Sequence, residues 1–195
     1  MDTQIRIPVF PLAIFPIPGE MVPLHIFEPR YQQLLKDAEE RDISFGIYFN
    51  HAQNTRKLGS LVKLESVMKR YPGGELDIIV KCLDLFSMGT LFRTFKEKLY
   101  PGGDVEFWQV DLHTSVGARL SKEFEEFRQL LKIPFLPVPC SVYSIAGELN
   151  LDFEERLKFV SLNLEKQESY LSSQLKYQKY LLSQADKARD VFHLN

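Results

Sequence analysis

The segment Phe10–Tyr31, with the sequence FPLAIFPIPGEMVPLHIFEPRY, places the strongest limits on how this chain folds. Apolar residues alternate through its first part, as in a strand with one buried face, and Pro18-Gly19 then predicts a turn. A second apolar run ends at Glu28-Pro29. Proline suits the first position of a helix because its φ is already fixed and its missing N–H is not needed there. The segment therefore predicts two strands, a turn and a helix that begins at Pro29.

Short apolar runs with strand preferences continue to about residue 113. About seven or eight strands at this spacing are typical of an all-β barrel or open roll and not of a parallel sheet. Two nearly identical segments, Tyr71–Glu75 and Tyr100–Asp104, contain Tyr-Pro-Gly-Gly. Proline fixes φ at the first corner of a turn and glycine accepts a positive φ at the next, so both segments are predicted to be hairpin turns.

After Thr114 the apolar spacing becomes helical. Apolar residues recur at three- and four-residue steps from Leu120 through Phe124 and Phe127 to Leu131. The proline cluster at residues 134–139 must end that helix and is predicted to form a stiff corner. A short helix is predicted over residues 141–149.

The pattern Asp152-x-x-Glu155 resembles a capping box and predicts the start of the longest helix. Its apolar rows weaken after Leu171, which favours a helix packed on its own subdomain over a coiled coil. The predicted fold class is therefore α+β, with a β subdomain over residues 1–114 that contains one short helix, and a helical subdomain over residues 115–195.

The composition describes an ordinary globular protein, with 195 residues of which 45% are hydrophobic and 26% charged. A net charge of −2 and a pI near 6.1 give no general attraction to nucleic acid or to an anionic membrane. The N-terminus lacks the pattern of a signal peptide, and no apolar stretch approaches the roughly 18 residues of a membrane span. A cytoplasmic protein without a membrane partner is expected. Its two isolated cysteines, Cys82 and Cys140, are expected to be reduced.

Motifs for catalysis are missing from the sequence. It contains no phosphate-binding G-x-x-x-x-G-K-[ST], no G-x-S-x-G and no H-E-x-x-H. The four histidines have no metal-ligand spacing. We therefore expect neither an enzyme nor a bound metal or cofactor.

Three strings in the first part of the chain, PVFPL, PIPGE and PLHIFEPRY, resemble the N-terminal substrate-binding domain of the Lon proteases. Weaker similarity continues through nearly the whole chain, without the ATPase and peptidase modules of Lon. The resemblance implies a PUA-like β-barrel or roll followed by a helical subdomain. Structural roles are expected for the residues of the third string: Pro23, His25, Phe27, Glu28, Pro29, Arg30 and Tyr31. Of these, Glu28 is expected to cap the helix, Arg30 to pair locally and Tyr31 to bury its ring against the strands.

The chain departs from the family pattern after the central hairpin. Lon domains carry a glycine there and then Arg-Phe, whereas this chain has Cys82 and then Leu85-Phe86, so that only Phe86 is retained. Loss of the glycine predicts a different local bulge.

In the proteases the resemblance implies recognition of unfolded or tagged polypeptide. The favoured hypothesis is accordingly a non-catalytic module that binds exposed polypeptide segments and delivers them to a protease or ATPase partner, or regulates one. A cleft between the two subdomains is the expected binding place, because pockets form preferentially at such junctions. The candidate contacts are aromatic side chains with arginines at the rim: Phe86, Phe107, Trp108, Arg70 and Arg93.

An RNA-binding module is the alternative hypothesis. It rests on the PUA-like resemblance and on basic residues near Tyr71 and Tyr100, since basic side chains beside aromatic rings can hold phosphates and stack bases. These basic residues are Lys63, Lys69, Arg70, Arg93, Lys96 and Lys98. Acidic residues offset them in number, which makes nucleic acid the weaker hypothesis.

Overall fold

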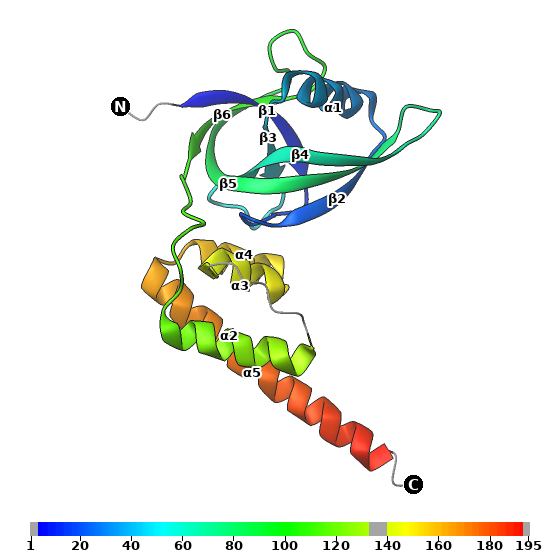
Figure 1. Cartoon of the computed structure of the whole chain (residues 1–195). Coiled ribbons are helices and arrows are strands. Elements are labelled where there is room, and N and C mark those ends of the chain that lie inside the picture. Colours follow the sequence, from blue (N-terminus) through cyan, green and yellow to red (C-terminus); the bar gives the residue numbers. More distant parts are fainter. Residues whose placement is uncertain (1–3, 133–139, 193–195) are drawn as a thin grey trace. The chain divides into compact units, whose positions relative to one another are not determined.

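The computed structural model describes residues 4–132 and 140–192, with the side chains of the final helix described to residue 185 (Figure 1). The chain divides into two compact units, Met1–Asp111 and Leu112–Asn195. This division lies close to the boundary predicted after residue 114. The predicted proline corner at residues 134–139 lies outside the described residues.

The first unit is built on six strands and one helix (Figure 1). The elements are β1 (Ile5–Leu12), β2 (Met21–Ile26), α1 (Pro29–Arg41), β3 (Phe45–Phe49), β4 (Leu58–Arg70), β5 (Leu76–Phe92) and β6 (Gly102–Phe107). The sheet order is β2-β5-β4-β3-β1-β6, and an additional pairing of β5 with β6 closes five of the strands into a barrel. Strand β1 runs parallel to β3 and antiparallel to β6. The predicted α+β fold, with a β-barrel first, is confirmed.

Strand β5 explains why the predicted strand number is too high. The sequence predicts one strand over Leu76–Met88 and another over Thr90–Leu99, but β5 runs unbroken from Leu76 to Phe92. It changes partner along one edge, pairing with β2 over Leu76–Lys81 and with β6 over Phe86–Phe92. Strand β4 borders its other edge, with three register shifts along the pair. Such bulges increase the local bend and twist, which closure of a small barrel requires.

The two Tyr-Pro-Gly-Gly segments have different structures. The first is the predicted β4–β5 hairpin turn: the N–H of Tyr71 donates to the carbonyl of Glu75 at 2.9 Å, and Gly74 has a φ of +95°. The prediction for the second is wrong, because Gly102 and Gly103 begin strand β6 and pair with both β1 and β5. A side chain at Gly103 would meet the Sδ of Met88 at 2.5 Å, so these glycines permit close packing instead of a turn.

Helix α1 begins at Pro29, as predicted, and packs its apolar side onto the barrel. Tyr31 is 3% exposed, and its ring stacks on Phe10 with 3.8 Å between the ring centroids. Glu28 has the extended backbone of an N-cap residue, but its side chain makes no capping hydrogen bond. It pairs instead with Arg30 at 2.7 Å. Glu28 therefore occupies the predicted capping position but does not cap the helix through its side chain, and the local pairing of Arg30 is confirmed.

The second unit contains helices α2 (Ala118–Leu131), α3 (Val142–Glu148), α4 (Phe153–Val160) and α5 (Leu164–Phe192). The predicted capping box is present, but it starts the short helix α4 and not the longest helix. Helix α4 ends at Val160. The side chain of Asn163 then accepts a hydrogen bond from the N–H of Lys166 at 3.1 Å, at the start of α5. One long helix was predicted, and two are found.

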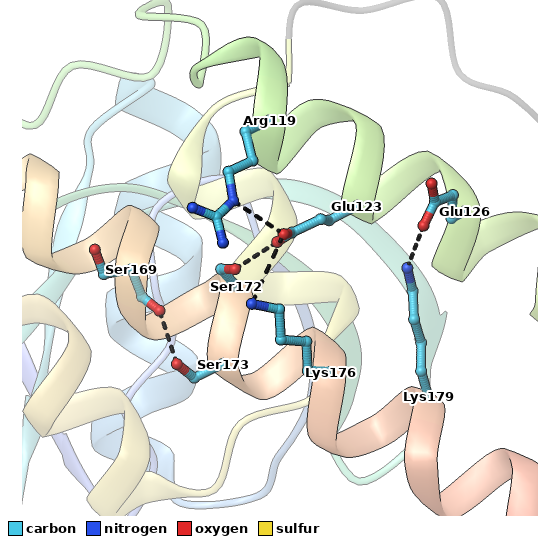
Figure 2. Close-up of polar contacts among 8 residues, drawn as sticks. All are labelled: Arg119, Glu123, Glu126, Ser169, Ser172, Ser173, Lys176 and Lys179. Atoms are coloured by element: carbon cyan, nitrogen blue, oxygen red, sulfur yellow. Dashed lines mark hydrogen bonds and ion pairs between the residues drawn. The ribbon is translucent and has the colours of Figure 1, made fainter.

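Helices α2 and α5 pack against each other, and polar contacts join them (Figure 2). Leu171 and Leu175 of α5 are fully buried. Beside them, Glu123 of α2 accepts a hydrogen bond from Ser172 and another from Arg119 at 3.2 Å, and Glu126 pairs with Lys179 at 2.8 Å. The hydrogen bond from Ser172 is the largest of the contributions that lower the pKa of Glu123. The first half of α5 is thus the centre of this unit.

Candidate functional site

The outward face of β2 brings exposed apolar side chains and fixed polar groups together. Exposed and partly buried residues alternate along the strand, and Met21 and Phe27 are 57% and 63% exposed. Residues paired in register in an antiparallel sheet share a face, so His25 lies beside Asp77 of β5, and Pro23 beside Ile79. We define the β2 face as the surface formed by Met21, Pro23, His25, Phe27, Tyr71, Asp77 and Ile79.

Asp77 is the polar centre of the β2 face. Its Oδ1 lies 2.7 Å from Nδ1 of His25, and its Oδ2 accepts a hydrogen bond from the hydroxyl of Tyr71, also at 2.7 Å. The hydrogen bond from Tyr71, followed by that from His25, lowers the pKa of Asp77. The Tyr71 ring meets the imidazole edge-on at 5.8 Å, and Nζ of Lys69 lies 4.3 Å from the centre of that ring. These contacts hold the histidine in one orientation.

One nitrogen of the His25 ring is available to a ligand. Because Nδ1 of His25 faces a carboxylate, it carries a proton, and the remaining ring nitrogen, Nε2, can contact a ligand. Within the described part of the chain, no serine or cysteine side chain hydrogen-bonds to this imidazole. The histidine and aspartate therefore lack the nucleophile of a hydrolytic triad. The ring of Phe27 lies nearly parallel to the imidazole at 6.1 Å and adds an aromatic surface beside it.

Strand β2 is also an edge strand, with β5 as its only strand partner among the described residues. Pro23 has no N–H, so it suits a position in the β2–β5 ladder where the backbone groups point away from β5. By alternation the backbone groups of Met21 and His25 point the same way. A polypeptide strand added at this edge could pair with the outward backbone groups of Met21 and His25, but Pro23 between them offers no N–H. Pairing along this edge is therefore limited to short segments.

Phe86, the first predicted contact residue, is 0% exposed. Its ring packs over Gly46 of β3 and Gly59 of β4, where only glycine leaves room for it. The prediction that Phe86 is exposed is wrong, because the glycines opposite the strand create a space that an aromatic ring fills. Contact with a ligand would require opening of the core.

Phe107 and Trp108 are both partly buried at the end of β6. Phe107 packs against the core cluster around Phe86. Trp108 follows the last residue of the strand, and its Nε1 donates to the hydroxyl of Ser87 at 2.9 Å. Arg56 lies over its ring at 5.5 Å.

The two predicted arginines do not join these aromatic residues into one site. Arg70 is exposed at the end of β4 and pairs with Glu39 of α1 at 2.6 Å. In register it faces Leu76, ten residues before Phe86 on β5, which is roughly 33 Å along the strand. Arg93 is exposed directly after the other end of β5. The predicted binding cleft between the units stays a prediction.

The residues behind the RNA hypothesis are mostly engaged elsewhere. Tyr100 is 1% exposed and donates its hydroxyl proton to Asp37 at 2.7 Å, so its ring cannot stack on a base. Lys63 pairs with Asp42, and Lys98 pairs with Asp37, each within the first unit. Burial and the hydrogen bond to Asp37 raise the pKa of Tyr100. Ion pairs with acidic residues in α1 and directly after it thus offset much of the predicted basic surface.

The β2 face contains residues that the sequence did not select. Met21, Asp77 and Ile79 were missed, and the alternation in Met21–Ile26 was the available signal for the first of them. Within the described residues, no group of three His, Cys, Asp or Glu side chains could hold a metal ion. The helices described here are too short or too polar to cross a membrane.

Comparison with known families identifies what kind of domain this is. Residues 6–190 match the family described as the ATP-dependent protease La (LON) substrate-binding domain. The chain belongs to this family. The LON domain assignment covers both units, and it places the chain among substrate-recognition modules.

Two solved LON domains share the fold. The Lon N-terminal domain protein from Xanthomonas campestris is 19% identical, with a TM-score of 0.67, covering 89% of this chain and 98% of the other. The N-terminal domain of the Mycobacterium avium complex Lon protease is 13% identical, with a TM-score of 0.62, covering 88% and 98%. A search among curated proteins finds no match.

Proposed function

We propose that this LON domain binds exposed segments of unfolded polypeptide on its β2 face. The observation that carries the proposal is the combination there of two large exposed apolar side chains, Met21 and Phe27, with a fixed His25–Asp77 pair. Unfolded chains differ in sequence, so their recognition needs apolar contact that tolerates variation and a few hydrogen-bonding groups. The β2 face supplies both.

Binding is expected to depend mainly on side chains. Pro23 interrupts the backbone donors along the β2 edge, so an extended segment gains only a few main-chain hydrogen bonds by adding to the sheet. The partner must also become ordered on binding, which lowers affinity. We expect a Kd of about micromolar or weaker.

Binding serves proteolysis in this proposal. The domain holds a segment of unfolded chain and passes it to a protease or ATPase partner, or controls access to one. The purified chain itself is expected to neither hydrolyse ATP nor cleave casein, because the motifs for both activities are missing. Cleavage that survives repurification and is abolished by one point mutation would contradict this.

The test is titration of reduced, carboxymethylated lactalbumin, which stays unfolded, against the wild type and the double variant Met21→Ser/Phe27→Ser. Both side chains are mostly exposed, so the double variant should fold. Loss of each apolar contact should cost about 1–2 kcal/mol, or roughly 5- to 30-fold in Kd.

Leu91→Ser is the matched control. Leu91 is 45% exposed and lies on β5, as Asp77 does, but at the far end, where it pairs with Gly103. This variant should bind as the wild type does. If the double variant and the control bind equally, the β2 face is the wrong surface. If the wild type does not bind, polypeptide recognition is wrong, and a parallel titration with single-stranded RNA then tests the alternative.

A further inference from the structure

A cavity in the helical unit holds a buried arginine with two unpaired nitrogens. The cavity has a volume of about 800 Å³ and is lined by α2, the segment before α2, and α3. Val116, Phe124, Cys140 and Arg128 form part of its wall. The N–H of Val116 donates to the carbonyl of Cys140 at 3.0 Å and joins two sides of the wall.

Arg128 is 5% exposed. Its Nε and Nη2 are buried, and neither has a hydrogen-bond partner in the described part of the chain. Its Cζ lies over the ring of Phe124, 5.8 Å from the ring centre. An arginine cannot lose its charge in a protein, and a buried charge without a partner is strongly unfavourable. Among the described residues, the site therefore lacks a hydrogen-bond acceptor that carries negative charge.

The unpaired nitrogens indicate the shape of that acceptor. Nε and Nη2 lie on the same edge of the guanidinium group, and two parallel N–H bonds from one edge match the two oxygens of a carboxylate. This chain contains an example: Nε and Nη2 of Arg6 bind the two carboxylate oxygens of Asp104 at 2.7 and 3.0 Å. The same edge of Arg128 has no such partner.

The rest of the cavity wall indicates what carries the carboxylate. Three glutamates, Glu125, Glu126 and Glu148, line it together with Lys122. A phosphate with two negative charges would be repelled by this acidic wall. A single carboxylate on an apolar body suits it better, since its body can contact the wall near Phe124.

Glu148 does not supply the missing charge. No ion pair joins it to Arg128 in the described residues, although both groups act on the thiol of Cys140. Burial raises the pKa of that thiol, the charge of Arg128 lowers it, and Glu148 raises it. The three groups thus lie near one another, while two nitrogens of the guanidinium stay unpaired.

We propose that the helical unit binds a carboxylate carried by an apolar group, and that Arg128 receives it through its Nε and Nη2 edge. Both nitrogens are covered in this conformation, so the side chain must turn about its terminal bonds to present that edge to the cavity that it lines. The site is separate from the β2 face and does not depend on polypeptide binding there.

Calorimetric titration of the full chain tests the proposal. The probes are N-acetyl-Ala-Leu-Phe with a free C-terminal carboxylate, the same peptide as its C-terminal amide, sodium octanoate and inorganic phosphate. The free acid should bind, the amide should bind at least about 10-fold more weakly, and phosphate should not bind. Octanoate distinguishes the source of the carboxylate: binding equal to that of the peptide indicates a free acid, and much weaker binding indicates a chain terminus.

Variants locate the site. Arg128→Lys keeps the charge but loses the two-pronged edge, so it should weaken binding of the free acid at least about 10-fold. Lys176→Met, at an exposed lysine of α5 that does not line the cavity, should change Kd by less than about 2-fold. Binding of acid and amide with equal affinity, absence of acid binding, or wild-type affinity in Arg128→Lys would overturn the proposal.

Thermal unfolding tests whether Arg128 pairs with Glu148 of the same chain instead of with a ligand. Without ligand, Arg128→Met should keep or raise Tm, because it removes an unpaired buried charge, and it should abolish the increase in Tm that the free acid produces in the wild type. If instead Arg128→Met and Glu148→Gln each lower Tm, and the double variant is no less stable than either, the two residues pair with each other in solution. That result would also overturn the proposal.

Discussion

The space around Phe86 provides the sharpest test of how the barrel is packed. A methyl group on Gly59 would lie 2.2 Å from Cζ of Phe86 and 2.8 Å from the carbonyl oxygen of Ile47. A methyl group on Gly46 would lie 2.8 Å from the same ring and 3.0 Å from Cδ1 of Ile7. The first substitution therefore collides with a ring and with backbone, and the second only with the ends of side chains.

The expected cost follows from these contacts. Ordinary contact begins near 3.4 Å, so Gly59→Ala must move the ring by roughly 1.2 Å, and the carbonyl cannot follow. Overpacking of a core costs about 1–3 kcal/mol, and the lost chain entropy of glycine returns about 0.4–1 kcal/mol. We expect Gly46→Ala to lower the free energy of unfolding by about 1 kcal/mol and Gly59→Ala by about 3 kcal/mol.

The assay is urea unfolding followed by fluorescence of Trp108, the only tryptophan, which lies in the same unit. Each alanine variant is measured with and without Phe86→Leu, which shortens the obstructing side chain. The double-mutant cycle should recover most of the cost of Gly46→Ala and only part of that of Gly59→Ala, because the carbonyl clash remains.

Gly19→Ala is the control, since no atom lies within 4 Å of its new methyl group. Its φ of +95° makes the substitution costly through backbone strain alone. Phe86→Leu should therefore give no relief. If Phe86→Leu changes neither the cost of Gly46→Ala nor that of Gly59→Ala, the Phe86 ring does not limit the space at these glycines.

Three further predictions concern α1. Tyr31→Ala should lower the free energy of unfolding by about 3–5 kcal/mol, whereas Tyr31→Phe, which keeps the stack on Phe10, should cost far less; equal costs in urea unfolding would contradict the stacking argument. Pro29→Ala should cost only about 0.4–1 kcal/mol in the same assay, because its effect lies mainly in the unfolded chain. Asp37 is 5% exposed; its burial favours a higher pKa, but hydrogen bonds from Lys98 and a tyrosine lower it overall. Its stabilising effect is thus present at neutral pH and is lost as pH falls below about 4, so Asp37→Ala should cost about 3 kcal/mol at pH 7 and less at pH 3; a cost independent of pH would rule this out.

The local signals in the sequence predicted local structure well. Pro29 marked the start of α1, and the capping box of Asp152 marked the start of a helix. The sequence did not show that this helix ends at Val160 and that a second cap at Asn163 starts the next one. A break of this kind leaves the heptad spacing of apolar residues intact, so periodicity alone favours one continuous helix.

Elsewhere the structure depends on contacts between residues far apart in the sequence, and these could not be predicted from local patterns. The same four residues form a turn at Tyr71 and start a strand after Tyr100, because two neighbouring strands pair with the second copy. Exposure of Phe86 could not be judged without knowing that Gly46 and Gly59 lie opposite it. The polar centre of the β2 face joins His25 to Asp77, far apart in the sequence, and only the strand register brings them together.

The pairing of β1 with β6 affects the order in which the chain can fold during synthesis. Ile5 faces Val105 in the closed barrel, so the first strand has no partner on that side until the last one has been made. At about 5–20 residues per second, a ribosome needs roughly 5–20 s to make the intervening residues. For that time the nascent N-terminal strand is itself an unfolded segment with an open edge, and its prolines at positions 8 and 11 reduce the backbone donors available for pairing with other nascent chains.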